Sequence, residues 1–179
     1  MKHYYTQNEY KELLKCLCII GTTNEQKNDH IKTFFEKKKI NFEERSLKTG
    51  DYCFKIKANK ELGFNVDTYF TDELFIERKN SLEELASSIN NEAFHYELKR
   101  SQLIQNKYLL IEQKDMQIHG WDDILNHNYL NNYNEKSFWT TLHTFETRYD
   151  LKIHFVPRDR MGLAIYTICK SVLDSKILK

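Results

Sequence analysis

The sequence contains a single proline, Pro157, and no proline-rich or glycine-rich linker, internal repeat or low-complexity segment divides its 179 residues. It has no apolar run near the roughly 20 residues that a membrane-spanning helix requires, and residues 1–15 are too polar for a signal peptide. We therefore expect a soluble cytoplasmic protein with no membrane partner. The formal net charge is only +1, so any site for a polyanion must be a local patch.

Cysteine is also scarce, and the four that are present, Cys16, Cys18, Cys53 and Cys169, have no CxxC or other metal-binding spacing. We expect reduced thiols that are mostly buried. Cys16 and Cys18 are two residues apart, which places them on one face of a predicted strand.

The composition, with 40% hydrophobic and 30% charged residues, is typical of a soluble globular protein, and the length favours one domain over residues 1–179. A leading helix is expected within residues 1–15, where Thr6 and Glu9 have capping-box spacing. Hydrophobic periodicity predicts helices over residues 29–39, 81–90, 93–105, 137–149 and 161–177, a short helix within 121–134, and strands over 16–20, 40–47, 50–58, 66–79, 107–113 and 151–156.

This alternation predicts an α/β fold, in which a mixed central β-sheet is flanked by helices. Leu109, Leu110 and Ile111 form the continuous apolar run that is typical of a central strand covered on both faces. Pro157 is expected just after the last strand, where no ladder donor is needed.

Charged residues end one of the predicted strands, in the sequence "FTDELFIERKNSLEELASSI". Side chains two apart on a strand share a face, so Glu77 and Lys79 are expected to project together and Arg78 to project the other way, toward carboxylate or carbonyl partners. A carboxylate beside an ammonium suits a metal-dependent hydrolase. A second carboxylate is then needed, and Asp51 at the start of the preceding strand is the candidate, with Gly50 allowing close approach of the backbone.

A second interpretation of these residues needs no chemistry. A Glu-x-Lys pair on a strand is commonly a solvent-facing ion pair, and Asp after Gly is ordinary in turns. The spacing alone leaves both interpretations open.

The segments "GDY", "FIERKNSLEELASSI", "YLLIE" and "SFWTTLHTFETRYDLKIHFVPRD" together resemble the nuclease domain of the XPF-type structure-specific endonucleases. That family has the restriction-endonuclease-like PD-(D/E)XK nuclease fold, and its signature is Glu-Arg-Lys followed by acidic residues that open a helix. The resemblance runs from about residue 15 to the end of the chain. It is closest to short phage-encoded members, for which the compartment would be the host cytoplasm.

The resemblance implies a divalent-metal-dependent DNA endonuclease. Asp51 and Glu77 would hold Mg²⁺ or Mn²⁺, Lys79 would serve the attacking water or the phosphate, and Glu25, Glu83 and Arg78 would be accessory. Glu84 has a sufficient structural reason, since it has capping-box spacing to Ser81. The implied substrate is branched or flapped DNA with a junction between single and double strands, bound by the nuclease face, a homodimer or a partner protein. We expect no C-terminal helix-hairpin-helix module, which larger members carry.

Departures from the family pattern support an alternative function. The first strand of the family usually ends in Asp-x-Arg-Glu, whereas this chain has Thr22, Asn24 and Glu25 there, and Ala93 stands where an arginine is frequent. The alternative is a catalytically weak or inactive DNA-binding member that acts as a decoy, an inhibitor or a dimer partner. A protein-interaction module with a purely structural Glu-Arg-Lys segment is a further possibility.

Basic residues near the helix after this segment are candidate contacts to a DNA backbone, namely Lys99, Arg100 and Lys107. A charged solvent-facing surface explains the same residues equally well.

Overall fold

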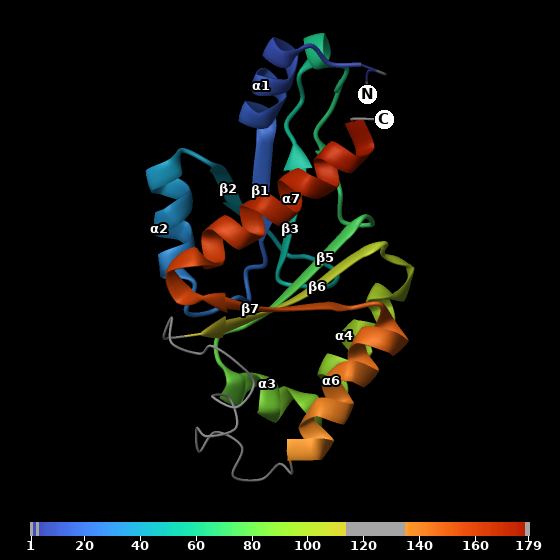
Figure 1. The fold of residues 1–179 in the computed structure, drawn as a ribbon. Helices are drawn as coiled ribbons and strands as arrows, with labels where there is room; N and C mark the ends of the chain where they lie inside the picture. Colours follow the sequence, from blue (N-terminus) through green and yellow to red (C-terminus); the bar gives the residue numbers. More distant parts are fainter. Residues whose placement is uncertain (1, 3, 114–134, 178–179) are drawn as a thin grey trace.

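A computed structural model of the chain describes residues 2, 4–113 and 135–177, in which helices pack on a β-sheet (Figure 1). The helices are α1 (Gln7–Cys16), α2 (Asp29–Lys38), α3 (Leu82–Ile89), α4 (Glu92–Arg100), α6 (Glu135–Tyr149) and α7 (Met161–Ile177), with short 3-10 helices η1 (Lys60–Leu62), η2 (Ser101–Leu103) and η4 (Arg158–Arg160). The strands are β1 (Leu17–Gly21), β2 (Asn41–Glu44), β3 (Tyr52–Ile56), β4 (Thr68–Tyr69), β5 (Leu74–Lys79), β6 (Asn106–Gln113) and β7 (Lys152–Pro157). The short helix expected within 121–134 lies outside the described residues.

The described strands form one mixed sheet in the order β2-β1-β3-β5-β6-β7, with the short β4 paired to β3. Strands β5, β6 and β7 are parallel, whereas β3 is antiparallel to both β1 and β5. Because β1 and β5 both run opposite to β3, they run in the same direction. The carboxyl ends of β1, β5, β6 and β7 and the beginning of β3 therefore lie along one edge of the sheet, where α/β proteins commonly place their sites.

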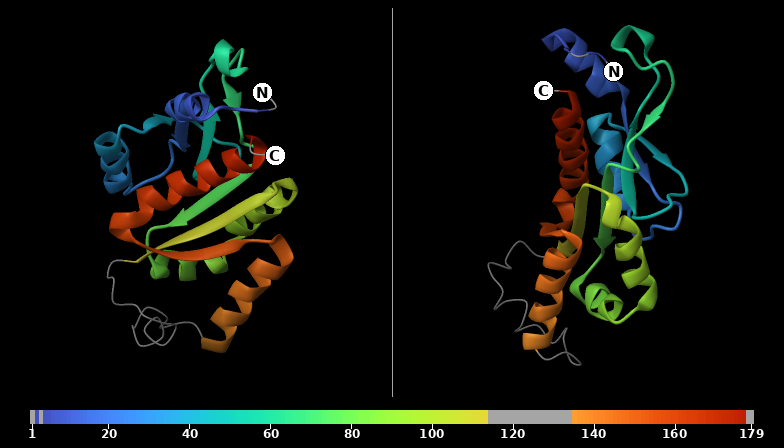
Figure 2. Two further views of the ribbon diagram at one scale, coloured as in Figure 1. Left: turned by 45° about the horizontal axis from the view of Figure 1, so that its top comes forward. Right: turned by 90° about the vertical axis from the view of Figure 1, so that its right-hand side faces the viewer.

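Helices cover both faces of this sheet, as the ribbon views show (Figure 2). One hydrophobic cluster joins α1, α2 and α7 to β1, β3 and one face of β6 through residues such as Leu110. A second cluster joins α3, α4 and α6 to the opposite face of β6 through Leu109 and Ile111. The predicted mixed α/β architecture and the doubly covered central strand are confirmed.

Local chemistry explains why most boundaries follow the prediction. The hydroxyl of Thr6 accepts the N–H of Glu9, and the Glu9 carboxylate accepts the N–H of Thr6, so the capping box at the start of α1 is confirmed.

Within the described residues, no helix has both the length and the apolar character that crossing a bilayer demands.

Three local expectations are corrected. Cys16 ends α1 and only Cys18 lies on β1, so the two thiols do not share a strand face. The helix continues through Cys16 because the side chains of Leu14 and Cys16 still pack against the core. The segment predicted as one strand over 66–79 is broken by a turn, in which Glu73 and Leu74 both donate to the carbonyl of Phe70. Pro157 is the last residue of β7 rather than the residue after it.

Candidate active site

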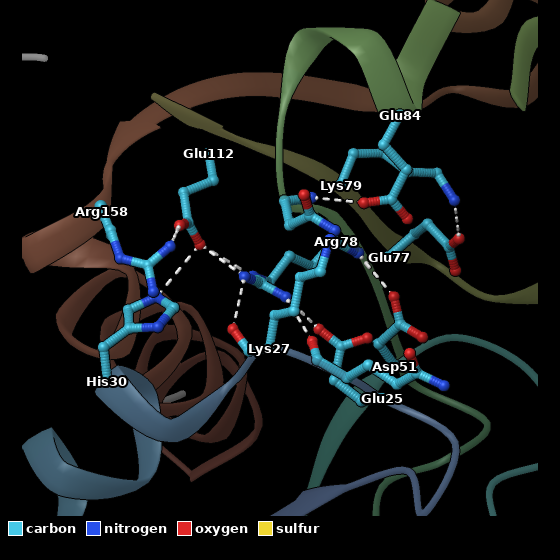
Figure 3. A network of polar contacts seen from close by, with 12 residues as sticks. Glu25, Lys27, His30, Asp51, Glu77, Arg78, Lys79, Glu84, Glu112 and Arg158 are labelled. Atoms are coloured by element: carbon cyan, nitrogen blue, oxygen red, sulfur yellow. Dashed lines mark hydrogen bonds and ion pairs between the residues drawn. The ribbon is translucent and has the colours of Figure 1, made fainter. Parts of the chain in front are cut away.

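The edge of the sheet described above gathers the charged residues that were singled out in the sequence (Figure 3). Glu25 follows β1, Asp51 immediately precedes β3, and Glu77, Arg78 and Lys79 end β5. Segments that are far apart in the chain therefore meet here because of the sheet topology.

Asp51 is fixed to β5 by its main chain and by its side chain. Its N–H donates to the carbonyl of Ile76 at 2.7 Å, and its Oδ2 accepts the N–H of Arg78 at 2.8 Å. Gly50 makes this approach feasible, because its φ is +75° and a Cβ there would lie 3.0 Å from the same Ile76 carbonyl. The expectation of a close backbone approach at Gly50 is confirmed.

Glu77 and Lys79 project to the same side of β5, as the strand alternation predicts. Lys79 Nζ lies 2.7 Å from Glu77 Oε1. Lys79 is 7% exposed and Glu77 is 8% exposed. The ammonium also lies 4.6 Å from the centroid of the Phe94 ring on α4. The pair is thus a buried ion pair rather than the solvent-facing pair that the second interpretation of the sequence requires.

The electrostatics of the three residues favour a cation between the carboxylates. Burial, with the charges of Glu77 and Glu25, holds the pKa of Asp51 well above its usual range. Burial also raises the pKa of Glu77, although Lys79 offsets part of this effect. Burial alone would lower the pKa of Lys79, but the charge of Glu77 and its hydrogen bond outweigh burial and raise it. Lys79 is therefore cationic, and the carboxylates repel each other.

The donor set fits a hard divalent cation. Asp51 and Glu77 offer carboxylate oxygens, and Mg²⁺ is commonly held by one or two carboxylates together with water and substrate phosphate. Among the residues that the structure describes, no cluster of three or more histidine, cysteine, aspartate or glutamate side chains could hold a metal ion. A cation here would consequently depend on water and on the phosphate for its remaining ligands.

Arg78 faces away from Glu77 and Lys79. All three nitrogens of its guanidinium donate hydrogen bonds inside the protein. Its Nε and Nη2 donate to Glu112 Oε2 at 3.1 and 2.6 Å, and its Nη1 donates to Glu25. It also donates to the carbonyls of Gln26 and Lys27. The expected structural role, with carboxylate and carbonyl partners, matches these contacts. Arg78 ties the segment after β1 to β5 and β6.

Glu112, which the sequence analysis did not single out, is the centre of this network. Its side chain is fully buried at the end of β6, and its Oε1 also accepts from Arg158 at 2.8 Å. His30 Nε2 lies 3.0 Å from its Oε2. Burial, with the charges of Arg158 and Arg78, lowers the pKa of His30 despite Glu112. The available signal was a carboxylate directly after the apolar run of a doubly covered strand, since such a group must have cationic partners.

The other acidic residues near the site differ in their contacts and exposure. Glu25 is bound by Arg78, and it lines a cleft of about 190 Å³ together with Asn24, Asn80 and Glu84. Glu84 accepts the N–H of Asn80, and its own N–H donates to Ser81 Oγ, so its structural role at the start of α3 is supported. Glu83 is exposed in the first turn of the same helix.

The three candidate DNA contacts also differ in exposure. Lys99 and Arg100 are exposed at the end of α4, and Arg100 Nη1 lies 3.3 Å from Glu97 Oε1. Lys107 is buried, and its ammonium donates to the Ile104 carbonyl at 2.6 Å. Only Lys99 and Arg100 lie where an external phosphate could reach them.

The position at which the resemblance places an aspartate lies beside Asp51. Thr22 is buried, and its N–H donates to the Asp51 carbonyl at 2.7 Å. Asn24 is exposed on the cleft, and Ala93 is exposed on α4. The site therefore contains Asp51, Glu77 and Lys79, and threonine stands where the resemblance places an aspartate.

Comparisons with known proteins agree with the predicted family and fold. The family model named ERCC4 domain matches residues 22–161. The fold is similar to that of XPF from Aeropyrum pernix, with a TM-score of 0.59 and 12% identity over 86% of this chain and 60% of that one. XPF from the same organism in complex with DNA gives a TM-score of 0.58 and 13% identity over 89% of this chain and 65% of that one. The chain thus spans less than two thirds of these proteins. No curated protein sequence matches it.

Proposed function

We propose that the chain is a divalent-metal-dependent endonuclease. It belongs to the ERCC4 domain family, and this membership supports a function as a DNA nuclease. It hydrolyses phosphodiester bonds in branched or flapped DNA, at junctions between single and double strands, as a cytoplasmic protein. Its selectivity for junctions comes from the nuclease face itself, from a homodimer or from a partner protein. One observation carries the proposal: the half-buried carboxylate of Asp51 and the buried carboxylate of Glu77 come from neighbouring strands and meet beside the ammonium of Lys79.

Each residue has a distinct part in the proposed reaction. Asp51 and Glu77 would hold Mg²⁺ or Mn²⁺, which when bound polarises the scissile phosphate and helps to activate water. Lys79 remains protonated beside Glu77, so it offsets negative charge that builds up on the phosphate rather than removing a proton from water. The Arg78 N–H holds the Asp51 carboxylate in place.

Cleavage of flap, fork and four-way-junction DNA tests this proposal, with Mg²⁺, Mn²⁺ or EDTA. Asp51→Asn and Glu77→Gln keep the side-chain shape, and each should lower the cleavage rate by about 100-fold or more, beyond the loss typical of residues that only orient ligands. Glu61→Gln, an exposed residue on η1, is the matched control and should cut like the wild type. Metal-independent cutting, or cutting that survives both substitutions, would refute the proposal.

The alternative function is a catalytically weak or inactive DNA-binding protein of the same fold. The observation that favours it is Thr22, whose main chain contacts Asp51 but whose side chain offers no charged ligand. DNA binding that persists in EDTA, with no cutting of any of the three substrates, would favour this alternative. Size-exclusion chromatography with and without DNA tests the homodimer.

A further inference from the structure

A second pocket lies near the candidate active site, next to η2. It has a volume of about 430 Å³, within the range of pockets that bind small organic groups. Cys53, Leu74 and Ile104 give it apolar walls, and Lys48 and Arg100 bring positive charge. This combination suits a ligand that has a flat apolar part and an anionic part.

The pocket is connected to the site through a short chain of contacts. Thr49 lines the pocket, and its hydroxyl donates to Glu97 at 2.6 Å. Glu97 lies close enough for its charge to raise the pKa of Glu77. Asp51 follows Thr49 by two residues. Two residues span at most about 7 Å, the length of about two stacked nucleotides, so a DNA strand whose phosphate lies at Asp51 can reach the pocket within a nucleotide or two.

The surface next to the pocket carries unusual exposed side chains. Leu103, on the pocket wall, is 98% exposed, and Tyr96 is 63% exposed. Tyr96, Arg100 and Leu103 follow each other at intervals of four and three residues, so they lie along one side of α4 and η2. The Arg100 guanidinium lies 5.9 Å from the centroid of the Tyr96 ring. Exposed aromatic and apolar groups interleaved with cations are typical of surfaces that bind single-stranded nucleic acid.

We propose that this pocket receives one unpaired nucleotide of the DNA strand next to the scissile phosphate. The base packs on Leu103 and Ile104, Lys48 and Arg100 contact the phosphates, and Asp72 accepts a hydrogen bond from a base amino group. Bases in a duplex are stacked and paired, so only an unpaired nucleotide can enter. The inference rests on the proposed function, and it assigns the single-stranded arm of the substrate to the surface of η2.

Fluorescence anisotropy in EDTA tests the inference without cleavage. The probes are a labelled duplex with a single-stranded arm and a blunt duplex of the same sequence. Lys48→Ala and Leu103→Ala remove exposed groups and should leave the fold intact. Each should weaken binding of the armed DNA by about tenfold and change binding of the blunt duplex by less than about twofold. Lys48→Ala should also reduce the salt slope for armed DNA by about one.

The matched controls are Lys11→Ala for the lost charge and Val66→Ala for the lost apolar group, since both residues are exposed and belong to other parts of the fold. Both should bind like the wild type. A fluorescent 2-aminopurine at the first unpaired position adds a direct signal, which should change on binding to the wild type and much less on binding to Leu103→Ala.

Equal losses on armed and blunt DNA, or no loss on armed DNA, would overturn the inference. The outcomes also separate it from the proposed function. Armed DNA that binds through the pocket but is never cut supports the inference and refutes the endonuclease. Cutting that requires Asp51 but is unaffected by Lys48→Ala and Leu103→Ala refutes the inference and leaves the endonuclease standing.

Discussion

The main-chain N–H of Arg78 donates a hydrogen bond of 2.8 Å to Oδ2 of Asp51, so one candidate metal ligand is held by the strand that carries the other. Asp51 therefore stays close to Glu77 although it is half-buried and lies near the negative charges of Glu77 and Glu25. This contact keeps the electrostatically unfavourable Asp51 carboxylate in place. The cost of that carboxylate to the stability of the fold can be measured.

We expect Asp51→Asn to stabilise the protein at neutral and higher pH. The folded protein raises the pKa of Asp51, so the contribution of this group to stability is full below the usual aspartate pKa of about 3.9 and is lost as pH rises through the raised value. Asparagine keeps an acceptor for the Arg78 N–H and carries no charge. Thermal unfolding at pH 8 without metal should show a gain of about 1 kcal/mol, whereas the exposed control Asp159→Asn should change by less than about 0.5 kcal/mol. A loss of stability in Asp51→Asn would contradict this account.

We expect Thr22→Asp to increase the affinity for Mn²⁺. The main chain at this position contacts Asp51, and the resemblance places an aspartate here, so we expect a carboxylate at position 22 to act as an additional hard ligand. Isothermal titration should show an affinity for Mn²⁺ higher by about tenfold, and the metal-free variant should unfold at a lower temperature because the new charge is buried. Thr23→Asp, at the exposed neighbouring position, is the control. Equal Mn²⁺ affinity in the two variants would show that Thr22 is remote from the cation.

We expect Arg78→Met to destabilise the fold strongly. The change would leave the fully buried Glu112 and the carboxylate of Glu25 without their shared guanidinium. Urea denaturation should show a loss of about 3–5 kcal/mol. Arg100→Met, which breaks the exposed pair with Glu97, should cost less than about 1 kcal/mol. Similar losses in the two variants would argue against Arg78 as an anchor.

We expect the adjacent glutamates of α3 to differ in their effect on stability. Glu84→Ala removes the acceptor of the Asn80 N–H, whereas Glu83→Ala removes an exposed side chain. Both substitutions remove one charge from the first helical turn, so the helix dipole contributes similarly to both. The difference in unfolding free energy should therefore report the hydrogen bond, at about 1 kcal/mol. No difference would mean that solvent replaces this contact at no cost.

We expect the cysteines to react at very different rates. All four are free, and only Cys16 is partly exposed. Burial raises the pKa of Cys53 to about 12 and also raises the pKa of Cys18 and Cys169, so little thiolate forms at pH 8. Mass spectrometry after brief iodoacetamide treatment should find one modified residue. Cys16→Ser should abolish this rapid phase, and rapid labelling of a second thiol would reveal local opening near a buried cysteine.

Much of the fold was accessible from the sequence because local and global signals agree. The capping box of Thr6 and Glu9 sets the start of α1, and the run Leu109–Ile111 identified the doubly covered strand. Asp51 and Glu77 could be paired in advance because a short meander returns the chain to the neighbouring strand. The break in the 66–79 segment was missed because its turn is closed by main-chain bonds to Phe70, which leave no glycine or proline signal.

The missed parts depend on contacts between distant segments. Glu112 and Arg158 are 46 residues apart, and no spacing rule joins them. Lys107 resembles any surface lysine in the sequence, yet the carbonyl of Ile104 draws its ammonium inward. The connection of Thr49 to Glu97 likewise depends on how α4 packs, which periodicity does not reveal.

The buried Glu112 contacts His30 at the start of α2 and balances the charges of Arg78 at the end of β5 and Arg158 in the turn before α7. A neutral residue at position 112 would leave Arg78 short of a partner, and a neutral residue at 78 would do the same to Glu112. Related chains should therefore exchange these positions only as a set, with His30 and Arg158 following. Statistical covariation among these four positions would then identify proteins that share this fold by descent, including relatives whose metal ligands have been lost.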